Sequence, residues 1–418
     1  MNAEIISIGD ELLIGQVINT NQAFIAQQLN SVGVSVQSMI TVGDTENEIL
    51  SAFEKTWRDT QVIIVTGGLG PTHDDITRQV VCRFFDDALV MNIDALKNIE
   101  RIVQGRNLRM RHEIEEQALV PMNAEIIHNA IGTAPGILYR KEGKYFFVLP
   151  GVPREMEFMM TNFIIPLLRE KNSGAVILHR TLKTVGIAES YLALTLGNIE
   201  TLHNHHPTTT LAFLPQIFSV RLRITVREKN LLQADEQIQR VEHNIREKIN
   251  NYIYGADDEE LEEIVGKILA QKNRTIAVAE SCTGGRIADK ITNVSGSSSY
   301  FFNGVVAYSN AMKISLLNVD ENLIKQFGAV SKEVAEAMAS GVRQISSASI
   351  GISTTGIAGP TGGSKEKPVG LVYLGYSTAE ETFAIQYFLG EGRKEIKERA
   401  SLAALELVRR KLSGIPLQ

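Results

Sequence analysis

The sequence has little cysteine, no large excess of charge of one sign and no long uncharged hydrophobic run. Its 418 residues include 2 cysteines, Cys82 and Cys282, which lie in different segments. We therefore expect no disulfide framework, and we expect the protein to be in a reducing cytoplasm. The 42 basic and 48 acidic side chains leave a net charge of −6, so no overall basic field is present to hold nucleic acid. We expect neither a membrane segment nor a secretory signal.

The chain is too long for one ordinary core, and its texture changes along its length. The runs AEIISIG, VSVQSMITVG and QVIIVTGG alternate with segments of helical period, which is typical of a doubly wound parallel sheet. After a smaller α+β segment, the alternation resumes at TIAVAE. We predict an α/β protein with two doubly wound three-layer α/β domains joined by a small α+β domain. The predicted domains are residues 1–170, 171–255 and 256–418.

The stretch AESCTGG, residues 279–285, places two hydroxyls and a thiol at a predicted strand-to-helix turn. Two interpretations are open. Ser and Thr at such a turn commonly cap the first turn of the helix. Alternatively, Ser281 or Cys282 is a nucleophile, and in that case a base must be found for it.

Histidine is absent after His243, so the base for a nucleophile in this part must be a lysine, a tyrosine or a carboxylate. The stretch VVAYSNAMK supplies Lys313, just beyond a strand of the buried type and close to Tyr308. A buried lysine can serve as a base because burial lowers its pKa and leaves the amine neutral.

A third stretch, STTGIAGPTGG at 353–363, is dense in glycine, so its backbone N–H groups can approach a phosphate or a developing oxyanion. Downstream, Arg393 can pair with a phosphate. The substrate-binding candidates of this part are Thr283, Gly284, Gly285, Thr355, Gly356, Ile357, Ala358, Gly359 and Arg393.

Near the N-terminus, IGDELLIGQVINTNQ and TGGLGPTHDDITRQ each follow a predicted strand. Glycines before a helix favour a phosphate, and neighbouring carboxylates favour a hard divalent cation that bridges to it. The candidates for phosphate or nucleotide binding are Asn21, Thr66, Gly67, Gly68, Gly70, Thr72 and Thr77. The candidate metal ligands are Asp10, Glu11, Asp74 and Asp75, although acidic residues also favour a first helical turn for its dipole alone.

Four stretches together, AESCTGG, GSSSYFFNGVVAYSNAMK, GAVSKEVAEAMASG and STTGIAGPTGG, resemble the C-terminal domain of the CinA family. That domain is similar to the nicotinamide mononucleotide deamidase PncC. The resemblance implies that Ser281 is the nucleophile, that Lys313 takes its proton and that Tyr308 supports the pair. It also implies that this reaction needs no cofactor.

The two N-terminal stretches resemble the molybdopterin-binding fold, and more closely the N-terminal domain of CinA. The resemblance implies an ADP-ribose pyrophosphatase that uses a divalent cation of unknown identity, alone or with a monovalent ion. One departure is Ile114-Glu115-Glu116 before Gln117, where the family tends to carry Asn and basic residues. The middle segment resembles the KH-like domain of CinA but lacks a G-x-x-G loop.

The preferred hypothesis is a bifunctional cytoplasmic hydrolase of NAD salvage that acts on nicotinamide mononucleotide and ADP-ribose. We expect no membrane partner, no nucleic acid partner and a homodimer, the last from the resemblance. Two alternatives stay open. One is a non-enzymatic competence or recombination factor, which would need a basic surface. The other is a molybdopterin-binding protein.

Overall fold

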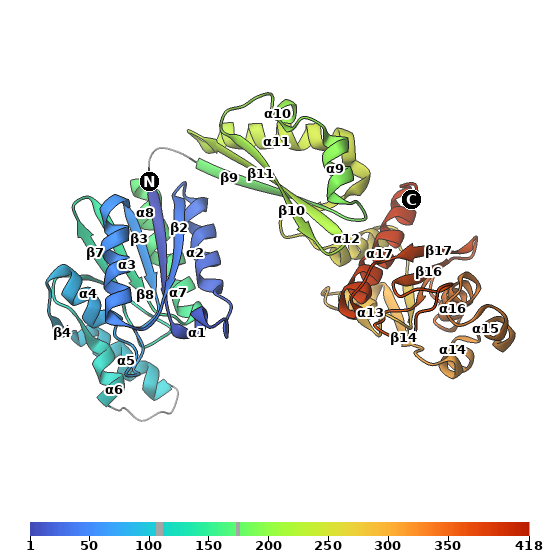
Figure 1. Ribbon diagram of the computed structural model, residues 1–418, viewed down its shortest axis with the longest axis horizontal. Coiled ribbons are helices and arrows are strands. Elements are labelled where there is room, and N and C mark those ends of the chain that lie inside the picture. Colours follow the sequence, from blue (N-terminus) through green and yellow to red (C-terminus); the bar gives the residue numbers. More distant parts are fainter. Residues whose placement is uncertain (106–111, 173–175, 418) are drawn as a thin grey trace. The chain divides into compact units, whose positions relative to one another are not determined.

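The computed structural model describes residues 1–105, 112–172 and 176–417, and it confirms the predicted fold class. Two α/β sheets and a smaller α+β sheet follow one another along the chain (Figure 1). The described residues divide into two compact units, 1–178 with 226–236 and 179–225 with 237–418. Within these residues, no helix combines the length and the apolar character that a bilayer crossing would need.

The first sheet has the strand order β2-β1-β3-β8-β7-β6. Strands β2, β1, β3 and β8 run parallel, as the sequence predicts, while β7 and β6 add an antiparallel edge. The strands are β1 (Asn2–Ile8), β2 (Ser35–Val42), β3 (Val62–Thr66), β6 (Glu125–Ile127), β7 (Gly136–Lys141) and β8 (Lys144–Leu149).

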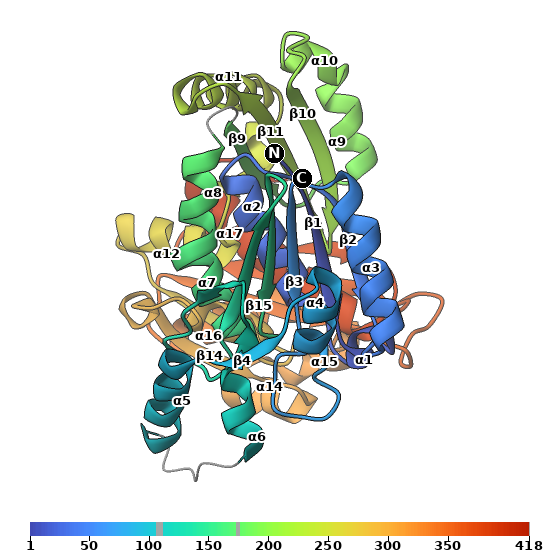
Figure 2. The same ribbon diagram turned by 90° about the vertical axis from the view of Figure 1, so that its left-hand side faces the viewer.

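Helices cover both faces of this sheet (Figures 1 and 2). In β3 the side chains alternate: Val62 and Ile64 pack into the core on one face, and Ile63 and Val65 into the core on the other. One face carries α2 (Thr20–Ser31), α7 (Pro153–Met159) and α8 (Ile165–Lys171), and the other carries α3 (Glu46–Asp59) and α4 (Thr77–Phe85). The remaining elements are α1 (Asp10–Leu13), α5 (Ile93–Gly105), α6 (His112–Glu115), β4 (Leu89–Met91) and β5 (Leu119–Pro121).

The middle sheet has the order β10-β11-β9-β12, with helices on one face (Figure 1). Its strands are β9 (Val176–Thr184), β10 (Thr209–Gln216), β11 (Ser219–Glu228) and β12 (Ile253–Ala256). Its helices are α9 (Glu189–Leu196), α10 (Ile199–Leu202) and α11 (Leu231–Ile249).

The C-terminal sheet has the order β14-β13-β15-β16-β17, in which the first three strands are parallel. Its strands are β13 (Ile276–Glu280), β14 (Phe301–Val306), β15 (Ile350–Gly356), β16 (Leu371–Ser377) and β17 (Thr382–Phe388). Strand β13 is central and buried on both faces: Ile276 and Val278 join one core, and Ala277 and Ala279 the other. The first face carries α12 (Leu261–Gln271), α13 (Arg286–Thr292) and α17 (Arg393–Ser413), and the second carries α14 (Asn310–Leu317), α15 (Glu321–Phe327) and α16 (Lys332–Ile345).

A buried ionic cluster on α17 fastens that helix to the segment before β12. The carboxylate of Glu406 accepts hydrogen bonds from Nε of Arg409 and Nε of Arg410, both at 2.6 Å. Arg409 also donates to the carbonyl oxygen of Asn251 at 2.7 Å. Since two buried guanidinium groups share one carboxylate, loss of Glu406 would leave both charges uncompensated.

We therefore expect Glu406→Ala to lower the free energy of unfolding by about 3–5 kcal/mol, the cost of breaking a buried ion pair. Glu395→Ala, an exposed site on the same helix, should change it by no more than about 0.5 kcal/mol. Urea unfolding followed by far-UV circular dichroism measures both, because the single tryptophan, Trp57, lies in the other unit. Equal midpoints for the two variants would contradict this account.

Candidate active site

Ser281 lies directly beyond the carboxyl end of β13, in the turn that leads to α13. The turn closes through Gly284 and Gly285, whose φ angles of 63° and 92° are in the region that favours glycine. The backbone N–H of Ser281 donates to the carbonyl oxygen of Thr354 at 3.0 Å, which ties the turn to β15. The side chain of Ser281 is 8% exposed, and it lines a cavity.

The first turn of α13 is capped by Glu280, not by the hydroxyls that follow it. The buried carboxylate of Glu280 accepts from the N–H groups of Gly285, Ile287 and Ala288 at 2.9, 3.1 and 2.8 Å. These are the orphan donors that a capping Ser or Thr would otherwise satisfy. The capping interpretation of Ser281 is therefore wrong, because a neighbouring carboxylate already has that role.

Lys313 reaches Ser281 from α14, the helix that follows β14, and β14 is the strand next to β13. Ala307 directly follows β14. The hydroxyl of Ser309 caps α14 by accepting a hydrogen bond from the N–H of Met312 at 3.2 Å. This cap places Lys313 on the first turn of α14 with its side chain directed into the domain. Nζ of Lys313 lies 3.0 Å from Oγ of Ser281, and the lysine is 2% exposed.

The surroundings of the Lys313 amine favour its neutral form. Nζ donates to the carbonyl oxygens of Ala307 and Tyr308, at 3.2 and 3.4 Å. Carbonyl oxygens can only accept, so two N–H bonds are used there and the lone pair of a neutral amine is free to face Ser281. Burial lowers the pKa of Lys313 below its ordinary value, and no carboxylate pairs with it in the described part of the chain.

Cys282, the alternative nucleophile, is in a poor environment for a thiolate. Its side chain is buried, and burial raises the pKa of the thiol to about 12. The thiol is thus protonated at neutral pH, and the thiolate is the form that attacks. The geometry favours the serine.

A cavity of about 210 Å³ opens over the Ser281–Lys313 pair. It brings together eight of the residues that the sequence singles out: Ser281, Cys282, Tyr308, Lys313, Thr355, Gly356, Ala358 and Arg393. It also contains the side chain of Asn310, which the sequence reasoning missed, although a carboxamide at the start of a helix is a visible polar signal.

Arg393 links two residues at the rim of this cavity, Gly359 and Tyr308. Its guanidinium donates to the carbonyl oxygen of Gly359 at 2.8 Å and to the hydroxyl of Tyr308 at 2.9 Å. The side chain of Tyr308 is 61% exposed. Tyr308 therefore contacts Nζ of Lys313 through its backbone carbonyl, and its side chain forms part of the cavity rim.

The glycine-rich loop contributes less uniformly than expected. Gly356 and Ala358 line the cavity, whereas the N–H of Ile357 is donated to the carbonyl oxygen of Leu371 at 2.9 Å, within the sheet. Thr283 is fully buried, and its hydroxyl bonds that of Thr354 at 2.7 Å. With Gly284 and Gly285 it lines a neighbouring cavity rather than the one over Ser281.

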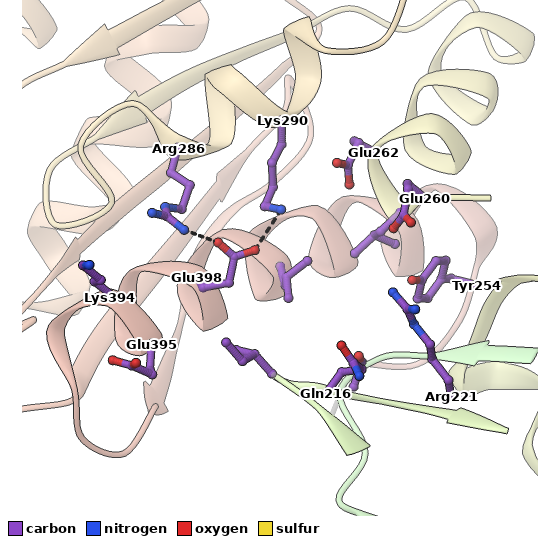
Figure 3. Close-up of a pocket in the computed structure, with 14 residues that line it drawn as sticks. Gln216, Arg221, Tyr254, Glu260, Glu262, Arg286, Lys290, Lys394, Glu395 and Glu398 are labelled. Carbon is purple, nitrogen blue, oxygen red and sulfur yellow. Dashed lines mark hydrogen bonds and ion pairs between the residues drawn. The ribbon is translucent and has the colours of Figure 1, made fainter. Parts of the chain in front are cut away.

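Another cavity, of about 500 Å³ (Figure 3), shares no lining residue with the one over Ser281 and Lys313. Glu398 stands between Arg286 and Lys290 there and forms an ion pair with each (Figure 3). Burial opposes ionisation of Glu398, but hydrogen bonds and the charges of Lys290 and Arg286 outweigh it and lower its pKa. The Ser281–Lys313 pair does not line this cavity.

The N-terminal domain has its own cavity of about 350 Å³ at the carboxyl ends of β1, β3 and β8. Of the predicted residues, Glu11, Gly67, Gly68, Gly70, Asp74 and Asp75 line it. Gln117 also lines it, while Glu115 and Glu116 do not. Glu116 forms an ion pair with His112 at 3.4 Å.

The predicted carboxylates do not close around one metal ion. In the described ranges, no three His, Cys, Asp or Glu side chains are grouped as metal ligands. Asp75 accepts from both the N–H and the hydroxyl of Thr72. The carboxylates of Asp10 and Asp44 each accept a hydrogen bond from the backbone N–H of the other residue. The donors fit a cation of the Mg²⁺ type, which takes one or two carboxylates and completes its shell with water and phosphate oxygens.

Asp44 was missed by the sequence reasoning, although it follows β2 in the same way that Asp10 follows β1. Burial raises its pKa, and the charges of Asp10, Glu11 and Asp74 add to that rise against a hydrogen bond from Asp10. These four carboxylates therefore create a negative field at the rim of the cavity, which would attract a cation.

The other predicted N-terminal residues are distributed around the first cavity. Asn21 donates to the hydroxyl of Thr66 at 3.2 Å and to the carbonyl oxygen of Gly151 at 2.8 Å. Asn21 and Thr66 line a second, smaller cavity beside it. Thr77 is fully buried beneath Gly68 and lines neither.

Three family models match the chain. They are described as "CinA C-terminal domain" (residues 258–412), "Probable molybdopterin binding domain" (4–170) and "Damage-inducible protein CinA KH domain" (179–255). A competence-damage inducible protein of Caldicellulosiruptor saccharolyticus is 43% identical over 98% of this chain and 99% of its own length. A CinA-like protein of Kosmotoga olearia is 41% identical over 99% of each chain. The crystal structure of the competence/damage inducible protein CihA from Agrobacterium tumefaciens matches at 37% identity, covering 37% of this chain and 93% of that chain, with a TM-score of 0.36.

Burial of Lys313 predicts that this lysine costs stability, so we expect Lys313→Met to raise the melting temperature of its domain. Each unit by which a pKa is lowered on folding corresponds to about 1.4 kcal/mol, or roughly 3–6 °C for a domain of this size. The unfolded chain binds more protons between the folded and unfolded pKa values, so wild-type stability rises with pH there. The gain should therefore shrink toward pH ~10.4.

Thermal unfolding of both proteins at several pH values between neutral and alkaline measures this difference. A Lys313→Met protein that melts below the wild type at neutral pH would show that the amine is a structural contact and not a strained functional group.

Proposed function

This chain belongs to the CinA family, and we propose that it is a bifunctional nucleotide hydrolase of a reducing cytoplasm. Its C-terminal domain deamidates nicotinamide mononucleotide, and its N-terminal domain hydrolyses the diphosphate of ADP-ribose. Both cysteines are free and buried, which agrees with a reducing compartment.

The observation that supports the deamidase is the 3.0 Å separation between Nζ of Lys313 and Oγ of Ser281 in a buried site. A serine hydroxyl is a weak nucleophile until a base removes its proton. Here the base is an amine that burial keeps neutral and that two carbonyl oxygens orient.

In the proposed reaction, Oγ of Ser281 attacks the carboxamide carbon while its proton passes to Nζ of Lys313. The ammonium then returns that proton to the carboxamide nitrogen, which leaves as ammonia, and an ester on Ser281 remains. Water, deprotonated by the same amine, hydrolyses the ester and yields the carboxylate product. Gly356, Ala358 and Arg393 line the cavity. In the proposed reaction, backbone N–H groups near Gly356 and Ala358 would stabilise the developing oxyanion, and Arg393 would bind the phosphate.

Ser281→Ala should lower ammonia release from nicotinamide mononucleotide by about 10³-fold or more, as for other enzymes whose nucleophile is removed. Lys313→Arg should lose as much, because a guanidinium stays protonated and cannot accept the proton. Cys282→Ala is the matched control in the same turn and should retain most of the turnover.

Circular dichroism of each variant shows whether it is folded. If Ser281→Ala keeps full turnover while Cys282→Ala loses it, the thiol is the nucleophile and the serine mechanism is wrong.

For the N-terminal domain, the support is the cavity that joins glycine-rich turns to a cluster of carboxylates. The turn from Gly68 to Gly70 lines the cavity and would offer backbone N–H groups to the diphosphate, and Glu11, on α1, lines the same cavity. When bound there, a divalent cation would neutralise phosphate charge and lower the pKa of an attacking water. The side chains that line this cavity would orient the diphosphate and hold the cation in place.

A chelator should therefore stop release of AMP from ADP-ribose and leave ammonia release unchanged. Glu11→Gln should reduce ADP-ribose hydrolysis by about 10- to 100-fold, the range for groups in or next to a metal site. Glu54→Gln, on the exposed face of α3, is the control and should have no effect. Equal sensitivity of the two reactions to chelator would argue against separate sites.

The names of the relatives are what supports the alternative of a competence factor, since they describe those proteins as competence-damage inducible. The net charge of −6 gives no support to direct nucleic acid binding. The hydrolase proposal rests on side-chain chemistry and is therefore preferred.

A further inference from the structure

The cavity of about 500 Å³ lies where the middle sheet meets the C-terminal helices, within one of the two compact units (Figure 3). The end of β10, the turn that follows it, β11 and β12 contribute to one wall, and α12, α13 and α17 contribute to the other. The two walls are joined, because Phe218 and Tyr254 from the middle sheet pack against the C-terminal core. Ligand pockets commonly have this volume and commonly lie between domains. Size and position are therefore those of a small-molecule site.

The charges around this cavity leave one cation in excess. Among the described residues, four lysine or arginine side chains and four glutamate side chains line it. One of the four carboxylates, that of Glu260, is paired at 2.8 Å with Lys183, which is not a lining residue. With Lys183 included, five cations stand against four carboxylates. The cavity can therefore accept one further negative charge.

The excess positive charge is located at Glu398, whose carboxylate is shared by Arg286 and Lys290 (Figure 3). One carboxylate cannot compensate both charges in full. The side chains of Arg286 and Lys290 are 37% and 17% exposed, so a ligand can contact them. Figure 3 shows Lys394 at the same end of the cavity as Arg286. The side chains of Arg286, Lys290 and Lys394 form what we call the cation cluster.

A phosphate group is the anion that the cation cluster fits. A guanidinium donates two parallel hydrogen bonds to phosphate oxygens, and a lysine amine binds phosphate as a compact charge. Lys394 is exposed and has neither a hydrogen bond nor an ion pair within the described part of the chain, so its amine is available to a ligand. The cluster therefore offers both kinds of phosphate donor on one cavity wall.

The lining also has an apolar part, which favours a ligand with a ring. Ile217, Leu261 and Leu402 line the cavity, and the side chain of Ile217 is 44% exposed. Tyr254 and Arg221 lie at the end of the cavity away from Arg286 and Lys394 (Figure 3). Aliphatic side chains bury the faces of a ring, and a planar guanidinium can stack on one.

We propose that this cavity is a third ligand site, which binds an organic phosphate that carries a ring. The cation cluster binds the phosphate, and the apolar part, with Tyr254 and Arg221, binds the ring. Among the described residues, the site shares no lining residue with the cavity over Ser281 or with the two N-terminal cavities. It therefore goes beyond the two proposed hydrolase activities and does not depend on either.

Pyridoxal 5′-phosphate is a suitable probe, because it joins a phosphate to an aromatic ring and carries an aldehyde. The aldehyde condenses with a nearby lysine amine to an imine and water, borohydride reduces the imine, and peptide mass mapping of the full chain identifies the lysine. We expect saturable labelling of Lys290 or Lys394 at concentrations at least about tenfold below those that label Lys55, an exposed lysine on α3. Pyridoxal, which lacks the phosphate, should show no such preference.

Two variants should change this phosphate preference in opposite directions. The quantity to compare is the labelling of the cavity lysine by pyridoxal 5′-phosphate divided by its labelling by pyridoxal. Arg286→Gln removes a cation and should lower this ratio about tenfold, whereas Glu398→Gln frees both of its partners for the phosphate and should raise it about tenfold. Glu321→Gln is the matched control, because Glu321 also pairs with a lysine, Lys325 at 3.0 Å, and lies on α15, outside the cavity. It should leave the ratio unchanged.

Equal labelling by the two probes, a label on Lys55 as strong as that on the cavity lysines, or a ratio that does not rise in folded Glu398→Gln would each overturn the proposal. A label on Lys313 alone would place the phosphate in the candidate active site and would overturn it as well. Labelling requires no turnover, so its failure is distinguishable from failure of the proposed function. A chain that hydrolyses neither nucleotide can still show the third site, and a chain that hydrolyses both can lack it.

Discussion

An amine buried without a carboxylate partner is the constraint on which the C-terminal site depends. Removing Lys313 from water is unfavourable for its charged form, and neither Ala307 nor Tyr308 offers a negative charge in return. The fold accepts this cost, and the result is an amine of lowered pKa beside Ser281. Many interactions that would make the domain more stable, such as an aspartate beside the amine, would also hold the proton on it and remove the base.

The turn that carries Ser281 shows how one residue can free another for chemistry. The carboxylate of Glu280 lies at the start of α13 and accepts hydrogen bonds from three backbone N–H groups there. The serine hydroxyl is therefore not needed for the helix and can face Lys313. The rigidity of β13, buried on both faces, holds the serine in position, and the cap of α14 by Ser309 holds the lysine.

The two α/β domains use the same architectural rule with opposite electrostatics. In each, functional groups gather at the carboxyl ends of parallel strands, where the strand order leaves room between loops. The C-terminal cavity has a buried amine and a guanidinium at its rim. The N-terminal cavity has carboxylates at its rim, and it adjoins a smaller cavity with which it shares Glu11. The first arrangement favours an anionic substrate directly, and the second favours a phosphate only together with a cation.

The sequence by itself determined the main buried strands, the helices between them and the position of the candidate residues at strand ends. Buried strands such as β13 and β3 were legible because their apolar runs and the glycine turns that follow them are local patterns. The antiparallel edges formed by β7 and by β16 and β17 were not predicted, because strand direction depends on the path of the whole chain.

Only the tertiary structure decided what the polar residues do. From the sequence alone, a serine before a helix can be a helix cap or a nucleophile. The choice depends on where Glu280 points and on a lysine 32 residues away. The same is true of Asp44, Asn310 and the amide orientation of Asn21, whose partners or neighbours come from other segments. Burial, charge and hydrogen bonding act through space, and local sequence patterns do not contain the distances that govern them.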